Sequence, residues 1–305
     1  MQISASMVKE LRERTGAGMM ECKKALVATD GDIEAAVENL RKAGQAKADK
    51  KAGRVAAEGV IAVEHSAAGA AMVELNCETD FVAKKDEFQA FAALAASVAL
   101  ARGATDAQSL GGLSPQDNGG GSLDEERRDL VATIGENITI RRAASIPMRG
   151  DHLGVYLHQG ARIGVVVELQ GGSEELARDV AMHVAAARPL ALDEASLDPA
   201  LLDKEREILR AQVADSGKPA EIQEKMLNGR MAKFLKENTL LGQPFVKDPD
   251  QSVARLTSGA GASILGYTRF EVGEGIEKKS ENFAEEVMAQ VRGSEQEPAG
   301  GKAPD

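Results

Sequence analysis

The hydrophobic positions of residues 3–44 recur at the three- and four-residue spacing of amphipathic helices. Ser4 or Ser6 is suited to cap the first helix, and Gly16 and Gly44 are suited to end the first and the third. The predicted apolar stripes are Val8 and Leu11, then Met19, Met20, Cys22, Ala25 and Leu26, then Ile33, Ala36, Val37 and Leu40. Three helices this short enclose little core, so we expect a small docking module.

From residue 55 the hydrophobic period changes to the alternation that is typical of half-buried strands. The runs VAAEGVIAVEHS (55–66) and GAAMVELNC (69–77) predict two strands joined by a tight turn. Three later runs, ITIRRAASIP, GVYLHQG and ARIGVVVELQ, predict further strands. Between the two groups we expect a helix with Phe88, Phe91, Leu94 and Val98 on its apolar face, a mobile Gly-rich loop at 111–121 and a helix at 123–135.

The second group of strands looks like a repeat of the first. MVELN (72–76) and VVELQ (166–170) hold equivalent places, and each precedes a helix. The second copy connects strand to helix through QGGSEE, whereas the first uses NCETDFVAKKDE, about twice as long. Long connections of this kind are often functional. We therefore expect Asp80 and Phe81 to lie in a loop that folding does not require.

The remainder of the chain predicts a helical hairpin followed by mixed elements. Apolar residues repeat along both arms of residues 193–235, and Ser216–Pro219 supplies a Gly stop and a Pro start between them. Beyond the hairpin lie GQPFV (242–246), a predicted strand ILGYTRFEV (264–272), a predicted last helix Ser280–Val291 and a polar tail expected to be disordered.

Charge and composition narrow the function classes. The 305-residue chain has a net charge of −11, which argues against nucleic acid as a main partner, because phosphate binding needs clustered Lys and Arg. The basic run from Arg41 to Arg54 is interpreted as a solvated helix end or linker. The start of the chain lacks the apolar region of a signal peptide, and no segment approaches about 18 uninterrupted apolar residues. We expect a cytoplasmic protein without membrane contact.

The motifs of common enzyme classes are absent from the sequence. It contains no GxxxxGK[ST] phosphate loop, no GxGxxG after a strand, and no HExxH or GxSxG. Cys77 lacks a cation nearby in the sequence to lower its pKa and is interpreted as an inert thiol. His183 lies between apolar neighbours and is interpreted as a packed core histidine. We expect no catalytic residue, no cofactor and no metal site.

Several motifs, taken in order, resemble those of the bacterial translation elongation factor Ts family. LRERTGAGMMECKKAL (11–26) and ELNCETDFVAK (74–84) resemble two signatures of that family. HQGARIGVVV (158–167), GKPAEIQEKMLNGRM (217–231), GQPFV and RFEVGEGIEK (269–278) also match. The resemblance covers the chain from residue 3 to about residue 291, and several motifs in the right order are more specific than any one of them.

The resemblance implies an α+β fold in which two related subdomains carry antiparallel sheets. Its five segments are a ubiquitin-associated-like three-helix domain with linker (1–54), a first core subdomain (55–137), a second core subdomain (138–192, completed by 236–279), an inserted helical-hairpin dimerisation module (193–235), and a C-terminal helix with tail (280–305). The hairpin also implies a possible homodimer.

The resemblance further implies a guanine-nucleotide exchange factor for the GTPase elongation factor Tu. Asp80 and Phe81 are implied to intrude near the partner's magnesium site. The other implied partner-binding residues are Thr79, Val82, Arg12, Met19, Met20, Lys23, Ile134, Gly135, His158 and Val246. The last helix departs from the family pattern, because Gln290 stands where some relatives carry a Met.

Two functions of other classes stay open beside this one. A helical adaptor or chaperone-like binding protein would use residues 3–44 and would leave GDP release unchanged. A thiol enzyme would use Cys77 and would lose its activity on alkylation.

Overall fold

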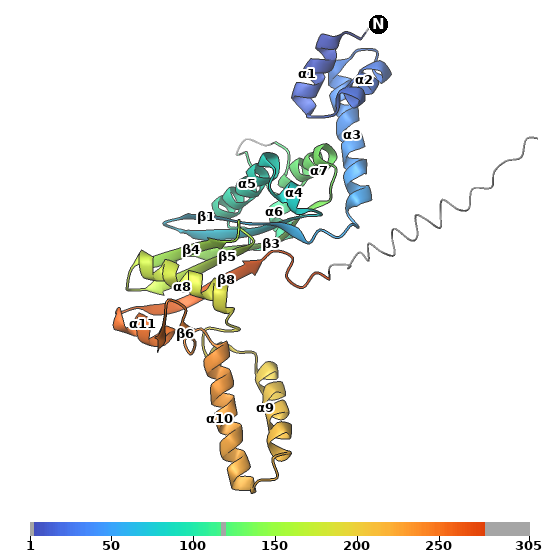
Figure 1. Ribbon diagram of the computed structural model, residues 1–305. Helices are drawn as coiled ribbons and strands as arrows, with labels where there is room; N and C mark the ends of the chain where they lie inside the picture. Colours follow the sequence, from blue (N-terminus) through green and yellow to red (C-terminus); the bar gives the residue numbers. More distant parts are fainter. Residues whose placement is uncertain (1–2, 117–119, 278–305) are drawn as a thin grey trace, which may run out of the picture. The chain divides into compact units, whose positions relative to one another are not determined.

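The N-terminal residues form a small bundle of helices. The structure is a computed structural model that describes residues 3–116 and 120–277 (Figure 1). The first three helices are α1 (Ala5–Thr15), α2 (Met19–Ala28) and α3 (Ile33–Lys51). The side chain of Ser4 caps α1 by accepting a backbone hydrogen bond. The apolar faces of the helices meet around Leu11 and Leu26, both fully buried, as the helical spacing predicted, whereas Met19 and Met20 of the predicted stripe are exposed.

Helix α3 does not end at Gly44, contrary to the sequence prediction. Gly44 is buried where α3 packs against α7 (Leu123–Ile134), and a Cβ atom on it would lie 3.1 Å from the Cβ atom of Ala132. The glycine therefore permits a close approach of two helices instead of stopping one. Within the basic run, Arg41 forms an ion pair with Glu125 of α7 at 2.6 Å. The run is thus partly a contact between helices and not only a solvated linker.

The strands form two three-stranded antiparallel sheets and a short two-stranded ribbon within the described residues. The first sheet has the order β1-β2-β3 and the second the order β4-β5-β8. Their strands are β1 (Glu58–Ser66), β2 (Gly69–Cys77), β3 (Ile138–Pro147), β4 (His152–His158), β5 (Ile163–Gln170) and β8 (Ser263–Glu271). These strands agree with the predicted alternating runs, and the α+β class with antiparallel sheets is confirmed.

Helices cover one face of each sheet, and the other two faces pack on each other (Figure 1). Helices α5 (Asp86–Arg102), α6 (Ala107–Gly111) and α7 contact the first sheet, and α8 (Glu174–Ala187) covers the second. Between the sheets, Ile61 and Met72 meet Val166 in one buried cluster. A Cβ atom on Gly164 would lie 2.5 Å from Cγ2 of Ile61, so the sheets approach closely there. The chain thus stacks helices, sheet, sheet and helices.

The two central strands share features that fit the predicted repeat. Glu74 of β2 and Glu168 of β5 are both buried, and the register shifts directly after each of them. Both carboxylates bind arginine guanidinium groups, Glu74 with Arg141 and Glu168 with Arg149. Each strand is followed along the chain by a helix that covers its sheet, β5 directly by α8 and β2 by α5 after the short helix α4 (Asp80–Ala83). The sequence repeat is therefore matched by a shared acid, a shared bulge and a shared following helix.

The predicted helical hairpin is present, and further elements follow it. Helices α9 (Pro199–Ala214) and α10 (Ala220–Asn238) pack on each other, and Gly217 in the turn has φ 64°. The 3-10 turn Glu194–Ser196 precedes the hairpin. After it come β6 (Pro244–Phe245), β7 (Asp248–Ser252) and α11 (Val253–Gly259), none of which was predicted from the sequence. These elements are too short to show a hydrophobic period.

Some predictions fall at or beyond the limits of the described chain. In the Gly-rich stretch, Gly111 belongs to α6 and the Leu113 carbonyl accepts a hydrogen bond from the Leu123 amide at 2.8 Å, so this end is anchored. Residues 117–119 and the predicted helix at 280–291 lie outside the described residues. Residues as far as Glu274 form one compact unit, so the five domain boundaries stay predictions. None of the described helices combines the length and the apolar character needed to cross a membrane.

Candidate functional site

The stretch CETDFVAK is not an open loop, contrary to the sequence prediction, because Asp80–Ala83 makes a single helical turn, α4. Thr79 caps this turn, and its hydroxyl accepts a hydrogen bond from the Val82 amide at 3.4 Å. The Phe81 side chain is 77% exposed. Val82 is buried in the core cluster under the first sheet. The turn therefore presents Phe81 to solvent and closes over the core with Val82, whose implied contact with the partner stays a prediction.

Asp80 places a negative charge beside the exposed ring. Its carboxylate accepts a hydrogen bond from Nζ of Lys84 at 2.7 Å, one turn later on the chain. This hydrogen bond lowers the pKa of Asp80, and the charges of Lys84 and Arg162 act in the same direction. The carboxylate is therefore ionised at neutral pH. The turn offers an apolar anchor and an anion on the same exposed edge.

Ile134 and Gly135 end the helix whose following residues contact this turn. Helix α7 stops at Ile134, and Gly135 caps it with φ 91°, a left-handed conformation that favours glycine. The next residue, Glu136, accepts hydrogen bonds from the amide and the hydroxyl of Thr79. Glu136 was not predicted from the sequence, because a single acid after a glycine carries no local signal. Only the fold brings it to Thr79, 57 positions earlier in the chain.

A second group of predicted residues gathers on the N-terminal helices. Arg12, Met19, Met20 and Lys23 line one cavity of about 430 Å³, hereafter the N-terminal groove. The side chains of Met19 and Met20 are 61% and 65% exposed, which is high for residues of their size and polarity. The groove is completed by Ile3, Ser4, Ala5, Val8 and Lys9. All four residues implied from the first motif thus lie on one surface, which combines two cations with two flexible thioethers.

His158 and Val246 line a third surface, a cavity of about 580 Å³. Tyr156 stacks on His158 with ring centroids 5.9 Å apart. The Val246 amide donates a hydrogen bond to Nδ1 of His183 at 3.1 Å, and the Val246 side chain is 47% exposed. His183 itself is buried, so its interpretation as a core histidine is confirmed. It fixes the backbone of a predicted contact residue.

The comparisons with known proteins agree with the motifs. A family model described as Elongation factor TS matches residues 78–274. An elongation factor Ts of Thioalkalivibrio sulfidiphilus is 59% identical over 96% of this chain and 100% of its own length. Those of Methylococcus capsulatus and Legionella pneumophila are 57% and 52% identical, over 96% and 95% of this chain and 100% and 99% of their own lengths.

The chain belongs to the elongation factor Ts family. Its relatives are translation elongation factors by name, which assigns the chain to protein biosynthesis. The family model begins at Glu78, after the three-helix bundle, so it covers α4 and the His158 surface but not the N-terminal groove. The relatives, which align over nearly the whole chain, extend the similarity to that bundle.

The surroundings of Cys77 argue against a thiol enzyme in this member of the elongation factor Ts family. Cys77 is fully buried, and burial raises the pKa of its thiol to about 12, with the charges of Glu136 and Glu58 acting in the same direction. The Sγ–H group donates to the Thr79 carbonyl at 3.1 Å. A protonated, buried thiol is a poor nucleophile. Among the described residues, no group of three or more His, Cys, Asp or Glu is placed to hold a metal ion.

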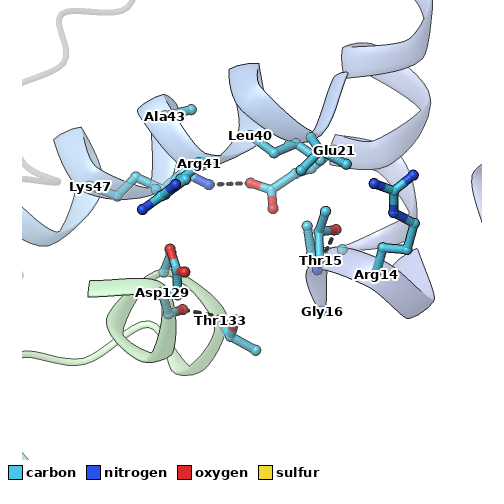
Figure 2. A pocket seen from close by; sticks show the side chains of 15 residues that line it. Arg14, Thr15, Gly16, Glu21, Leu40, Arg41, Ala43, Lys47, Asp129 and Thr133 are labelled. Carbon is cyan, nitrogen blue, oxygen red and sulfur yellow. Dashed lines mark hydrogen bonds and ion pairs between the residues drawn. The ribbon is translucent and has the colours of Figure 1, made fainter. Parts of the chain in front are cut away.

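One further cleft lies between the N-terminal helices and α7 (Figure 2). It has a volume of about 330 Å³, and the Lys47–Glu21 ion pair crosses its wall. The side chains of Asp129 and Thr133 face it from α7. None of the partner-binding residues implied by the sequence lines this cleft. It belongs to the packing of α3 on α7 and not to the surfaces described above.

Proposed function

We propose that this chain is a guanine-nucleotide exchange factor that promotes GDP release from elongation factor Tu. The observation that carries the proposal is the exposed Phe81 ring on a capped helical turn beside the ionised Asp80. An aromatic side chain in this position serves as an anchor in a partner pocket, because aromatics dominate interface energetics. Exchange requires no bond-making side chain, which fits a site built from Phe, Asp and Met and not from nucleophiles.

The mechanism follows from how a GTPase holds its nucleotide. Magnesium bridges the phosphates and a Ser/Thr hydroxyl of the GTPase. Burying the Phe81 ring in the partner contributes roughly 1.5–3 kcal/mol, which can offset the cost of displacing the elements around the metal. The Asp80 carboxylate adds a competing negative charge. The wedge, formed by Asp80 and Phe81, weakens the contacts of the nucleotide phosphates with the metal and the GTPase. It does not touch the guanine base.

The other two surfaces hold the partner while the wedge acts. The N-terminal groove, with Arg12, Met19, Met20 and Lys23, and the His158 surface, with Val246, are separate patches of exposed apolar and polar groups. Binding of the partner through these two surfaces does not depend on its nucleotide. Insertion of Asp80 and Phe81, in contrast, competes with nucleotide binding. Because such coupling is reciprocal, GTP binding to the partner must weaken the complex by the same factor. The factor is then released and acts again.

The test is the release of a fluorescent GDP analogue from elongation factor Tu, chased with unlabelled GDP. The full chain at a small fraction of the partner concentration is expected to accelerate release. The double variant Asp80→Ala/Phe81→Ala is expected to bind the partner and to lose most of the acceleration. A helical adaptor acting through residues 3–44 would bind without accelerating release, and a thiol enzyme would lose its effect after alkylation under denaturing conditions and refolding. Either result would overturn the proposal.

A further inference from the structure

The two chain segments that carry Thr79 and Glu136 are joined by side chains where the sheet ends. The pairing of β2 with β3 finishes at Cys77 opposite Ile138. One position beyond, the Asn137 amide donates to Oε1 of Glu78 at 2.6 Å. The Thr79 amide donates in turn to Oε2 of Glu136 at 3.0 Å. Each segment supplies an acid that accepts the backbone N–H of the other, so carboxylates continue the ladder past the last strand pair.

Glu136 also controls the hydroxyl group that caps α4. The Thr79 hydroxyl donates to Oε1 of Glu136 at 2.7 Å and accepts from the Val82 amide at 3.4 Å. A hydroxyl has one hydrogen to donate, and the carboxylate takes it. The lone pairs are then left for the Val82 amide. Glu136 therefore fixes the rotamer of the cap and, through its second oxygen, the backbone at the entry to the turn.

The backbone on both sides of Glu136 is held in place by hydrogen bonds. The Lys51 side chain donates to the Gly135 carbonyl, directly before it. Asn137, directly after it, is 2% exposed, and its side-chain amide donates to the Arg54 carbonyl at 2.7 Å. The turn between α7 and β3 is thus tied to the end of α3. A contact from Glu136 transmits this fixed position to α4.

Helix α4 needs such a contact because of its length. It contains only four residues, and a first helical turn fixes several dihedral angles for a single hydrogen bond, which is unfavourable in isolation. Packing of Val82 and Ala83 holds its inner side. The outer side, with Asp80 and Phe81, has no packing of this kind, since the Phe81 ring is largely exposed. Its orientation depends on the cap and therefore on Glu136.

We infer that Glu136 is a positioning residue for nucleotide exchange, which holds Asp80 and Phe81 in their inserting orientation through Thr79. This inference rests on the proposed function of the Asp80–Phe81 turn. Glu136 acts on the partner only through that turn. Its loss leaves the N-terminal groove and the His158 surface unchanged, because neither includes Glu136 or Thr79.

The first experiment compares Glu136→Ala with wild type in stimulated GDP release as a function of factor concentration. We expect the maximal rate to fall by at least about tenfold, the lower limit for the loss of one hydrogen bond to a charged group, and the half-saturating concentration to change less than twofold. Glu64→Ala, which removes an exposed acid from the outer end of β1, is the control and is expected to match wild type. A rise in half-saturating concentration with an unchanged maximal rate would overturn the inference, because it would make Glu136 a docking residue.

The second experiment uses Thr79, at which the hydroxyl alone can be varied. Thr79→Val keeps the amide bond to Glu136 and loses the hydroxyl, whereas Thr79→Ser keeps both. We expect the maximal rate to fall in Thr79→Val and to be restored in Thr79→Ser, with equal melting temperatures for the two variants within about 2 °C. Equal rates for the two variants would show that the cap does not matter and would overturn the inference.

A mutant cycle separates this inference from the proposed function. Glu136→Ala is measured in the wild-type chain and in the Asp80→Ala/Phe81→Ala variant. If Glu136 acts through the turn, its substitution has no further effect once the turn's side chains are gone. A full additional effect in that background would overturn the inference while leaving the proposed function intact. Wild-type rates in the Asp80→Ala/Phe81→Ala variant itself would instead overturn the proposed function.

Discussion

The exposure of the large apolar side chain of Phe81 is not explained by the stability of the fold. Its side chain is 77% accessible to solvent, and it contributes little to the core. We therefore expect Phe81→Ala to change the free energy of unfolding by no more than about 0.5 kcal/mol, as at other surface sites. The same change should slow stimulated GDP release by the equivalent of about 2 kcal/mol, as the loss of an aromatic anchor does. Urea unfolding and nucleotide release measure the two effects separately.

The control for this prediction is Leu190→Ala. Leu190 is also a large, exposed apolar residue, with 55% of its surface accessible, and it lies in none of the three proposed partner surfaces. It should leave both stability and exchange unchanged. Asp80→Ala should slow release in the same direction as Phe81→Ala, and the pair should be less than additive because both groups belong to one turn. Unfolding of Phe81→Ala would make Phe81 a core residue and contradict the prediction.

His183 makes the stability of the chain depend on pH. Its Nδ1 accepts from the Val246 amide at 3.1 Å, so Nε2 carries the hydrogen and donates to Gln243 Oε1 at 3.0 Å. Burial lowers the pKa of His183. The unfolded chain, with a histidine pKa of about 6.5, then binds more protons than the folded chain in the window below that value. The stabilising contribution is complete above about pH 6.5 and is lost as the pH falls towards the folded pKa.

The test is urea unfolding between about pH 8 and pH 5, where His183 titrates in the unfolded chain. We expect the free energy of unfolding of wild type to fall over this range, beyond what the acids contribute. His183→Phe should be less stable at pH 8, because it loses two hydrogen bonds, but its stability should fall less on acidification. Parallel pH profiles for the two proteins would show that His183 is not the titrating group.

At the scale of elements, the α9–α10 hairpin is an insertion whose ends meet. The Leu190 amide donates to the Asn238 carbonyl at 2.8 Å, and Ala191 bridges to Thr239. The hairpin buries Leu209 and Val213 between its own arms but leaves Ile208 and Ile222 more than 40% exposed. We propose that these exposed residues meet a second copy of the chain. The hairpin is then removable without disturbing the second sheet.

The corresponding prediction is that deletion of residues 193–235, bridged by a short Gly/Ser linker, leaves GDP release partly intact. Leu190 and Ala191, just before the deletion, already meet Asn238 and Thr239, just after it, so the linker closes a short gap and adds little strain. The mass of the particle in solution should fall by more than the deleted residues. Light scattering at several concentrations measures it. Complete loss of exchange in a folded deletion variant would place the hairpin in the exchange machinery instead.

Hydrophobic period predicted the long elements, and tertiary contacts decided the short ones. The main strands and the helices α5, α8, α9 and α10 each extend over enough residues for a hydrophobic pattern to be readable from the sequence. Helix α4 has one turn and depends on Glu136, which is far away in sequence. The sequence predicted that Gly44 ends a helix. Its actual role, to allow the close approach of Ala132, is visible only in the fold. The resemblance to the family implied Arg12, Met19, Met20 and Lys23, but their clustering on two helices, like the meeting of His158 with Val246, required the fold.

At the scale of the whole molecule, Glu74 ties the two sheets together. It is fully buried in β2, accepts from Arg141 at 2.9 Å and also accepts from the Gly273 amide, just beyond β8 of the other sheet, at 2.9 Å. Glu168, its counterpart in β5, binds the more exposed Arg149 and the amides of Arg149 and Gly150. One acid therefore joins two sheets, and the other joins a strand to a neighbouring turn.

We expect Glu74→Gln to lower the free energy of unfolding by roughly 3 kcal/mol, the lower end of the range for breaking a buried ion pair, because the arginines around it are partly exposed. Glu168→Gln has the same chemistry and should cost less, since Arg149 keeps its hydration. Urea midpoints of the two variants make the comparison. An equal or larger loss in Glu168→Gln would show that the contact between the sheets is not what Glu74 stabilises.

Removal of magnesium tests whether the Asp80–Phe81 turn acts on the metal site of the partner or elsewhere in its nucleotide site. If insertion of Asp80 and Phe81 weakens magnesium coordination, a chelator that removes the metal already causes the same weakening of nucleotide binding before the factor binds. The acceleration by wild type should then shrink on chelation, and the rates of wild type and Phe81→Ala should converge.

The control variant is Met20→Ala, at an exposed position of the N-terminal groove, which weakens docking by a route that does not involve the metal. Its defect at limiting factor concentration should persist after chelation. If the difference between wild type and Phe81→Ala also persists, Phe81 contacts the nucleotide site away from the metal, and the magnesium mechanism is wrong although the exchange activity remains.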